Sequence, residues 1–127
     1  MTDGVWPSTI VPGTYIGSPD DIPWRELEGR NGQAQVKFFG ESRETGPWVS
    51  LVSFAPGYSE PPHWHEFDTV YIPIKGAMTI GSEGEMRAGQ VRWVRAGTYY
   101  GPETATGEGC EFWLISAGFP ALHYEKP

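Results

Sequence analysis

The sequence lacks paired cysteines, long apolar runs and clusters of basic residues, which are the usual signs of a secreted, membrane or nucleic-acid-binding protein. Its single cysteine, Cys110, cannot form a disulfide within the chain, which is typical of a reducing compartment. No apolar run reaches the ~20 residues that span a membrane, and the first residues lack a secretion-signal pattern. The 9 basic residues, against 16 acidic ones, form no cluster. We therefore expect a cytoplasmic protein without a nucleic-acid or membrane partner.

Sustained helical periodicity is also missing, which argues against long helices. Apolar residues come instead in short runs separated by glycine- and proline-containing turns. These runs predict strands over residues 33–39, 48–54, 69–74, 77–80, 90–94 and 110–116. Residues 77–80 are expected to pair back on 69–74 across Lys75-Gly76, and a tight hairpin is expected at 81–84. The pattern predicts an all-β sandwich or barrel.

The chain of 127 residues has room for one domain. Residues 1–20 contain several helix and strand breakers and predict an irregular N-terminal arm, followed by a barrel domain over residues 21–127. The arm carries apolar residues, among them Trp6 and Ile10. These should pack either on the barrel of the same chain or on a partner subunit.

The pair His63 and His65 is the pattern most directly linked to chemistry. In an extended chain, residues two apart point to the same side, so both imidazoles project together while Trp64 points away. Two convergent imidazoles are a common start of a site for iron, manganese, nickel, copper or zinc. The alternative is that two neighbouring histidines fill a polar mouth and bind nothing.

The glycines around this pair have a recognisable spacing. Five residues separate Gly57 from His63-Trp64-His65, and six separate Thr69 from Gly76. Five residues likewise separate Gly89 from Arg95-Ala96-Gly97, and two residues separate Gly97 from Tyr100. Over residues 48–116 this pattern resembles the two motifs of the cupin superfamily, in particular its small single-domain members. The resemblance implies a single-domain jelly-roll barrel (a double-stranded β-helix) with a metal site, and pairing into homodimers, which the apolar arm also favours.

The chain departs from the cupin motifs at two metal-ligand positions. Thr69 stands where the family has glutamate, and Tyr100 stands where it has histidine. The resemblance therefore implies a degenerate site in which His63 and His65 need another ligand, because protein sites generally use three or four. Tyr100 as a phenolate, the Glu103 carboxylate or His123 from the tail could supply it. Tyr100 could instead hydrogen-bond a metal-bound water.

Strand alternation predicts which side chains form the walls of the pocket. If Thr69 faces inward, Tyr71 and Pro73 share its face, and Pro73 should lie at a sheet edge or at a bulge. The same alternation places Val91, Trp93 and Phe112 inward. Arg92 and Arg95 are expected at the surface, and Cys110 in the core. Thr69, Tyr71, Trp93 and Phe112 are thus the expected substrate-binding residues, unless the rings merely fill the barrel.

These residues predict a small metal-dependent enzyme acting on a small organic substrate, aromatic or polyketide-like. Its reaction would be of the dioxygenase, lyase, or isomerase or cyclase type. His63, His65 and Glu103 would hold the divalent metal, and Tyr100 would supply a proton or stabilise an oxyanion. Two alternatives remain open: a cupin that binds or senses a small molecule without catalysis, and a metal-free acid–base enzyme using His63 and Tyr100.

Overall fold

The computed structural model describes residues 11–127, in which every regular element except one short 3₁₀ turn is a β-strand. The elements are η1 (Pro19–Asp21), β1 (Arg25–Glu26), β2 (Ala34–Phe39), β3 (Thr45–Phe54), β4 (Ser59–Glu60), β5 (Thr69–Ile80), β6 (Gly84–Arg87), β7 (Arg92–Val94) and β8 (Glu103–Gly118). All strand pairs are antiparallel, in the order β1-β2-β3-β8-β5-β6, while β4 pairs with β8 and β7 with β5. The expected all-β jelly-roll barrel is confirmed.

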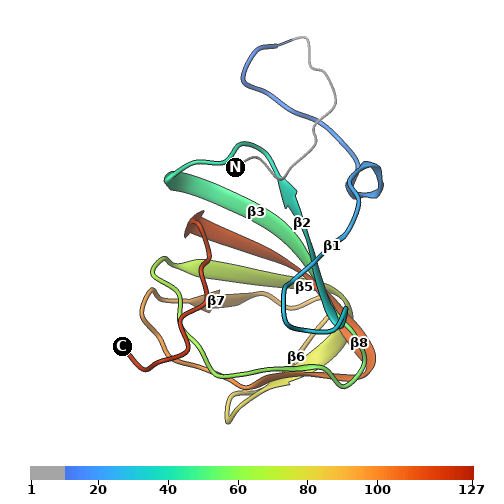
Figure 1. Ribbon diagram of the computed structural model, residues 1–127, viewed down its shortest axis with the longest axis vertical. Helices are drawn as coiled ribbons and strands as arrows, with labels where there is room; N and C mark the ends of the chain where they lie inside the picture. Colours follow the sequence, from blue (N-terminus) through green and yellow to red (C-terminus); the bar gives the residue numbers. More distant parts are fainter. Residues whose placement is uncertain (1–10) are drawn as a thin grey trace.

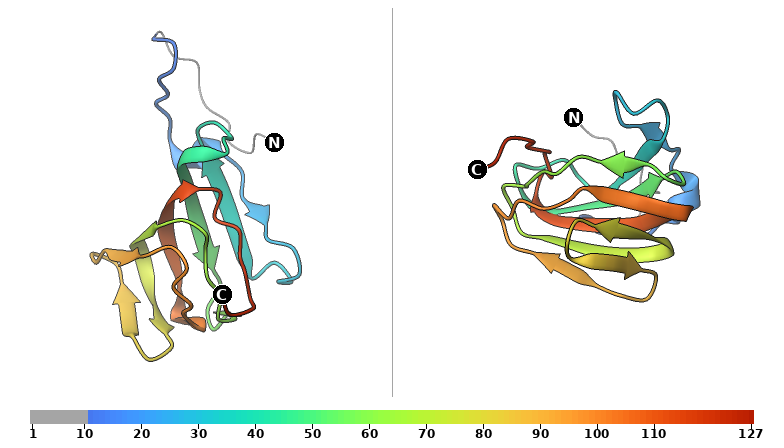
Figure 2. Two further views of the ribbon diagram at one scale, coloured as in Figure 1. Left: turned by 90° about the vertical axis from the view of Figure 1, so that its left-hand side faces the viewer. Right: turned by 90° about the horizontal axis from the view of Figure 1, so that it is seen from below.

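The long strand β8 joins the two halves of the barrel. It pairs with β3 on one side and with β5 on the other, and the curved sheet wraps around the core (Figures 1 and 2). After β8, the C-terminal segment of residues 119–127 returns along the barrel. Phe54, Met78 and Phe112 are among the buried residues of the main core between the two halves.

Two strand assignments made from the sequence are corrected. Residues 77–80 do not fold back on 69–74, because β5 runs without interruption from Thr69 to Ile80. Its bends are taken up by register shifts at Pro73/Lys75 and Gly76/Met78, so the bulge expected at Pro73 is present. The final strand begins at Glu103, not at Cys110, because its first half pairs with β4 and the end of β5. The hairpin at residues 81–84 connects β5 to β6 as expected.

Gly76 shows why a motif glycine is required. Its φ is +72°, a conformation that glycine adopts at little cost. A Cβ atom at this position would lie only 2.0 Å from the carbonyl oxygen of Gly109 in β8. The glycine therefore allows β5 and β8 to approach closely at the bulge.

The described part of the N-terminal arm extends away from the barrel (Figures 1 and 2). Val11 and Ile16 are largely exposed there, whereas Ile22, just after η1, is buried against Phe39 and Leu51 on the outer side of the sheet. Residues 1–10, including Trp6 and Ile10, lie outside the described residues. Within residues 11–127, no helix is long and apolar enough to cross a membrane.

Candidate functional site

A cavity of about 290 Å³ lies inside the barrel between β2, β3, β8 and the C-terminal segment 119–122. Its walls are mostly apolar and include five aromatic rings: Phe38, Phe54, Tyr71, Phe112 and Phe119. The polar side chains His63, His65, Glu60, Glu103 and Ser50 also contribute to the lining. The volume is at the lower end of the range of about 300–1,000 Å³ that is usual for small-molecule pockets.

Backbone hydrogen bonds on both sides hold the segment that carries the two histidines. His63 exchanges backbone bonds with Tyr100, and the Gly97 amide donates to the His65 carbonyl at 2.9 Å. On the other side, Trp64 exchanges backbone bonds with His123 in the tail. The chain between β4 and β5 is therefore extended at this point, and the alternation inferred from the sequence places both imidazoles in the cavity wall.

Hydrogen bonds to backbone carbonyls determine the tautomers of both rings. His63 Nδ1 lies 2.7 Å from the carbonyl oxygen of Pro61, and His65 Nδ1 lies 2.9 Å from that of Ala121. A carbonyl oxygen only accepts, so in both rings Nδ1 carries the hydrogen and donates it. Each neutral ring therefore keeps a lone pair on Nε2. His65 Nε2 is buried and has no partner within the described chain.

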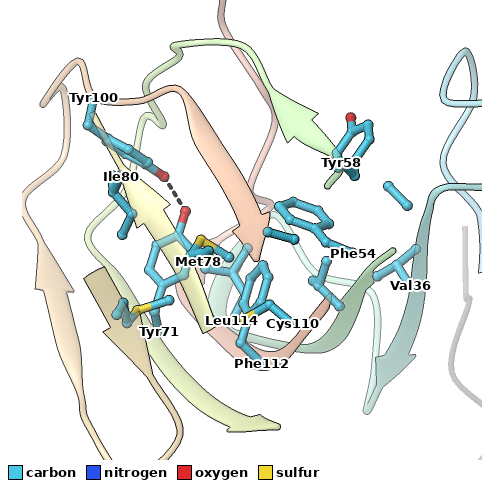
Figure 3. Packing of buried hydrophobic residues seen from close by; sticks show 14 of the residues in the cluster. Val36, Phe54, Tyr58, Tyr71, Met78, Ile80, Tyr100, Cys110, Phe112 and Leu114 are labelled. Carbon is cyan, nitrogen blue, oxygen red and sulfur yellow. Dashed lines mark hydrogen bonds between the residues drawn. The ribbon is translucent and has the colours of Figure 1, made fainter. Parts of the chain in front are cut away.

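The Nε2 atom of His63 begins a chain of polar contacts that leads into the barrel. The Tyr100 hydroxyl lies 3.1 Å from His63 Nε2 and donates to it, and the Tyr71 and Tyr100 hydroxyls are hydrogen-bonded to each other (Figure 3). Glu103 Oε1 lies 3.6 Å from His63 Nε2, while Glu103 Oε2 is buried without a partner in the described structure. Four side chains from three segments of the chain, with Tyr100 and Glu103 three residues apart, thus form one buried network.

Burial shifts the pKa values of these groups in opposite directions. Desolvation raises the pKa of Glu103 to about 7, against the lowering effect of nearby Arg92 and Tyr71. Desolvation lowers the pKa of His65 to about 4, helped by the neighbouring His63, and also lowers the pKa of His63 itself. Near neutral pH the histidines are therefore neutral, while Glu103 is present in both its protonated and its ionised form.

Strand β7 corrects the predicted wall of the pocket. Val94 and Arg92 pair with the inward-facing Thr69 and Tyr71, and directly paired residues share a face of the sheet. Trp93, predicted to bind substrate, consequently points outward and is 58% exposed. Val91, also predicted inward, is exposed as well. The alternation predicted for β7 is one residue out of register, and a shift of one residue moves every side chain of a strand to the opposite face.

Arg92, expected at the surface, lies instead behind the site. Its guanidinium carbon is 4.4 Å from the ring centre of Tyr100 and 4.9 Å from that of Tyr71, which are cation–π distances. Two hydrogen bonds to Glu83, of 2.9 and 2.6 Å, hold it there. The inward position of a charged residue is thus compensated by a carboxylate and two aromatic rings.

A cluster around Glu60 was missed from the sequence. The Glu60 carboxylate is buried and accepts from Tyr58 at 2.5 Å, Tyr124 at 2.7 Å and Arg30 at 3.1 Å. Burial alone would raise the pKa of Glu60, but these hydrogen bonds outweigh it and lower the pKa. The cluster ties the C-terminal segment to the barrel. The only signal of this cluster in the sequence is that Glu60 lies three residues before His63.

The remaining predicted residues are distributed as follows. Tyr71 and Phe112 line the cavity as expected, while Thr69 is fully buried outside its lining, and its hydroxyl has no partner among residues 11–127. Tyr100 touches His63 from behind the lining. His123 stacks on Trp64 and contacts Glu66 at 2.9 Å, outside the cavity lining.

The donor atoms fit a metal in kind but not in arrangement. Within the part of the chain that the structure describes, His65 Nε2 and Glu103 Oε2 are buried without a partner, and both imidazoles present Nε2. Among residues 11–127, however, no three His, Cys, Asp or Glu side chains are grouped closely enough to hold a metal ion. The structure brings His63 and Glu103 together without completing a three-ligand site.

Comparison with solved structures shows the same fold at low sequence identity. An acetylacetone dioxygenase from Acinetobacter johnsonii has a TM-score of 0.69 at 18% identity, covering 88% of this chain and 78% of that one. The polyketide cyclase RemF from Streptomyces resistomycificus has a TM-score of 0.72 at 17% identity, covering 87% and 84%. A chain in the complex of Rhodobacter sphaeroides SigE with the anti-sigma ChrR has a TM-score of 0.64 at 19% identity, covering 78% of this chain and 51% of that one.

Among curated proteins, none matches the sequence. The family model of the ChrR cupin-like domain matches residues 13–117, which is most of the chain. The protein therefore belongs to the ChrR cupin-like domain family of the cupin superfamily.

Proposed function

We propose that this cupin is an isomerase-type enzyme that moves protons on a small, largely apolar organic substrate. The observation that supports this is the position of Glu103: its carboxyl is buried in the cavity wall, and Oε1 lies 3.6 Å from His63 Nε2. Its Oε2 has no partner among the described residues. A carboxyl with a pKa of about 7 can both give and take a proton near neutral pH. His65, kept neutral, is a second proton acceptor in the same cavity.

The two groups can cooperate in converting an enol to a ketone. His65 Nε2 accepts the enol O–H proton, while protonated Glu103 gives its proton from Oε2 to the enol carbon; solvent then returns a proton to Glu103 and takes one from His65. Tyr71, hydrogen-bonded to Tyr100, lies beside the carboxylate that is left, and Arg92 lies behind the tyrosine rings. Tyr100, donating to His63 Nε2, holds the histidine against Glu103. Two titratable groups whose pKa values are pushed apart are the usual acid–base pair of an enzyme.

The names of two structural neighbours are compatible with this chemistry. Acetylacetone and polyketides are carbonyl compounds that form enols, and this chain shares the fold of an acetylacetone dioxygenase and a polyketide cyclase. The aromatic and apolar cavity walls suit such a substrate better than a sugar phosphate.

A metal-dependent enzyme is the second candidate, supported by the unpartnered Nε2 of His65 and Oε2 of Glu103. His63, His65 and Glu103 would hold a divalent transition metal, which supplies Lewis-acid or oxygen-activating chemistry when bound. Because these donors do not form a three-ligand group as they stand, the acid–base function is placed first.

The test is the ketonisation of benzoylacetone, followed by the loss of enol absorbance after dilution from an apolar solvent. We expect acceleration by the wild type before and after treatment with a chelator, with the rate lowered at least ~100-fold in Glu103→Gln. The exposed Glu108→Gln is the matched control and should retain the rate. Acceleration lost with the chelator, together with stoichiometric metal, would favour the metal-dependent enzyme. No acceleration in any form would favour a cupin that only binds or senses its ligand.

A homodimer is also part of the proposal. On the outer face of the sheet, Trp93 pairs across to Val70, Val70 to Ile115 and Ile115 to Val49, which makes an apolar row over four strands. Exposed apolar side chains of the arm, such as Ile16 at 85% exposure, form a second apolar surface. A second copy of the chain would bury both. The cytoplasmic location likewise remains a proposal.

A further inference from the structure

The polar atoms of the cavity define the kind of ligand that it can hold. We propose that the site selects an uncharged aromatic or conjugated molecule carrying an enol or phenol hydroxyl, and that this hydroxyl donates to His65 Nε2. The inference rests on the acid–base function proposed for the same cavity and names its substrate class.

The need for a donor follows from the fixed tautomer of His65. Its Nδ1–H is committed to the carbonyl of Ala121 at 2.9 Å, so Nε2 offers a lone pair and no hydrogen. This atom is buried and has no partner in the described structure. An unsatisfied buried acceptor destabilises the empty site, and a ligand O–H removes this cost whereas an ether or hydrocarbon does not.

The exclusion of anions follows from the charges around the cavity. Among the described residues, no lysine or arginine lines it, whereas Glu60 and Glu103 do. Each of the two nearby arginines is paired with a carboxylate: Arg30 donates to Glu60 at 3.1 Å, and Arg92 donates to Glu83 at 2.6 Å. Arg92 Nη1 is buried without a partner among the described residues, but the guanidinium lies over the Tyr71 and Tyr100 rings and not in the cavity lining. A carboxylate or phosphate ligand would therefore lose its hydration and meet carboxylates without a free cation. An ammonium ligand would also lose its hydration, because the Glu60 carboxylate is already taken by Arg30, Tyr58 and Tyr124 and Glu103 is only partly ionised near neutral pH.

The preference for a flat ring follows from the aromatic walls. Tyr71 and Phe112 are stacked with ring centres 5.3 Å apart, and Phe54 meets Phe112 edge-on at 5.3 Å. Figure 3 shows these rings side by side in the core, with Tyr71 pointing its hydroxyl toward Tyr100. A conjugated ligand can pack against such rings while its hydroxyl reaches the histidine end.

Titration calorimetry with four small probes tests this selectivity on chelator-treated wild-type protein. Phenol is a stable enol, anisole lacks the donor, benzoate is an anion and benzylamine is a cation at neutral pH. We expect phenol to bind about 10-fold more tightly than anisole, and neither charged probe to match it. His65→Leu should make phenol and anisole equal, whereas His123→Leu, outside the cavity, should retain the preference.

A second measurement does not depend on the folding of a variant. In nitrogen-15 spectra of the wild-type histidine side chains, phenol should shift the Nε2 resonance of His65 and leave that of His123 in place. Equal binding of phenol and anisole, tighter binding of benzoate or benzylamine, or no binding of phenol would each overturn the inference. Phenol cannot isomerise, so selectivity without ketonisation would refute only the proposed reaction. Ketonisation without selectivity would refute only this inference.

Discussion

Replacing Glu103 by glutamine should remove a contribution to the stability of the protein that changes with pH. The folded protein raises the pKa of this carboxyl from 4.5 to about 7, mainly by burial. The folded state therefore binds the proton more tightly than the unfolded state does. The stabilisation that proton binding by Glu103 gives the folded state is complete below pH 4.5 and is lost as the pH rises through 7.

The size of the effect follows from the same shift. At about 1.4 kcal/mol per pH unit, moving the pKa from 4.5 to about 7 corresponds to about 3 kcal/mol. Glutamine keeps the shape of the side chain but cannot ionise. We therefore expect the unfolding free energy of Glu103→Gln, relative to wild type, to increase by about 3 kcal/mol between pH 4.5 and 7.5.

Urea unfolding followed by tryptophan fluorescence at a series of pH values measures this difference directly. Glu108→Gln controls for the loss of one negative charge at an exposed position. A constant difference between Glu103→Gln and wild type over the whole range would refute the reasoning. It would mean that Glu103 titrates as an exposed carboxyl does, and Glu103 would then not be the proton donor of the site.

Three further predictions concern packing and assembly. Gly76→Ala should destabilise the fold by about 3 kcal/mol or more in urea unfolding, because its Cβ would overlap the Gly109 carbonyl at a positive φ; a loss below 1 kcal/mol would contradict the close approach of β5 and β8. Cys110, whose pKa burial raises to about 12, should not react with a thiol reagent until the protein unfolds; rapid reaction of the native protein would disprove its burial. Sedimentation at micromolar concentration should show a dimer for wild type and a monomer for Trp93→Glu; a monomeric wild type would remove the proposed pairing.

Several features of the site were readable from the sequence because they are local. The alternation of an extended chain is a property of neighbouring residues, so His63 and His65 could be placed on the same side without knowing the fold. Phe112 and Cys110 were placed correctly for the same reason, since residues two apart on a strand share one face. The motif glycines Gly57 and Gly76 are likewise tied to backbone conformations that other residues rarely adopt.

The errors and omissions all concern contacts between distant segments. Strand β7 has only three residues, and its register is set by pairing with Thr69 and Tyr71, so its own alternation could not decide whether Arg92 or Trp93 faces inward. Residues 77–80 were separated from 69–74 because Lys75-Gly76 reads as a turn, although long-range pairing with β8 keeps β5 continuous through a bulge.

The sequence by itself determined that the chain is an all-β cupin with a pair of histidines on one side of an extended segment. Local periodicity and the spacing of glycines are sufficient for that. Only the tertiary structure decided which carboxylate joins the histidines: β8 brings Glu103 to 3.6 Å from His63, forty residues away in the chain. The tertiary structure also decided that the C-terminal segment fixes His65 through Ala121. Such contacts depend on strand pairing and burial across the whole barrel, which no short stretch of sequence contains.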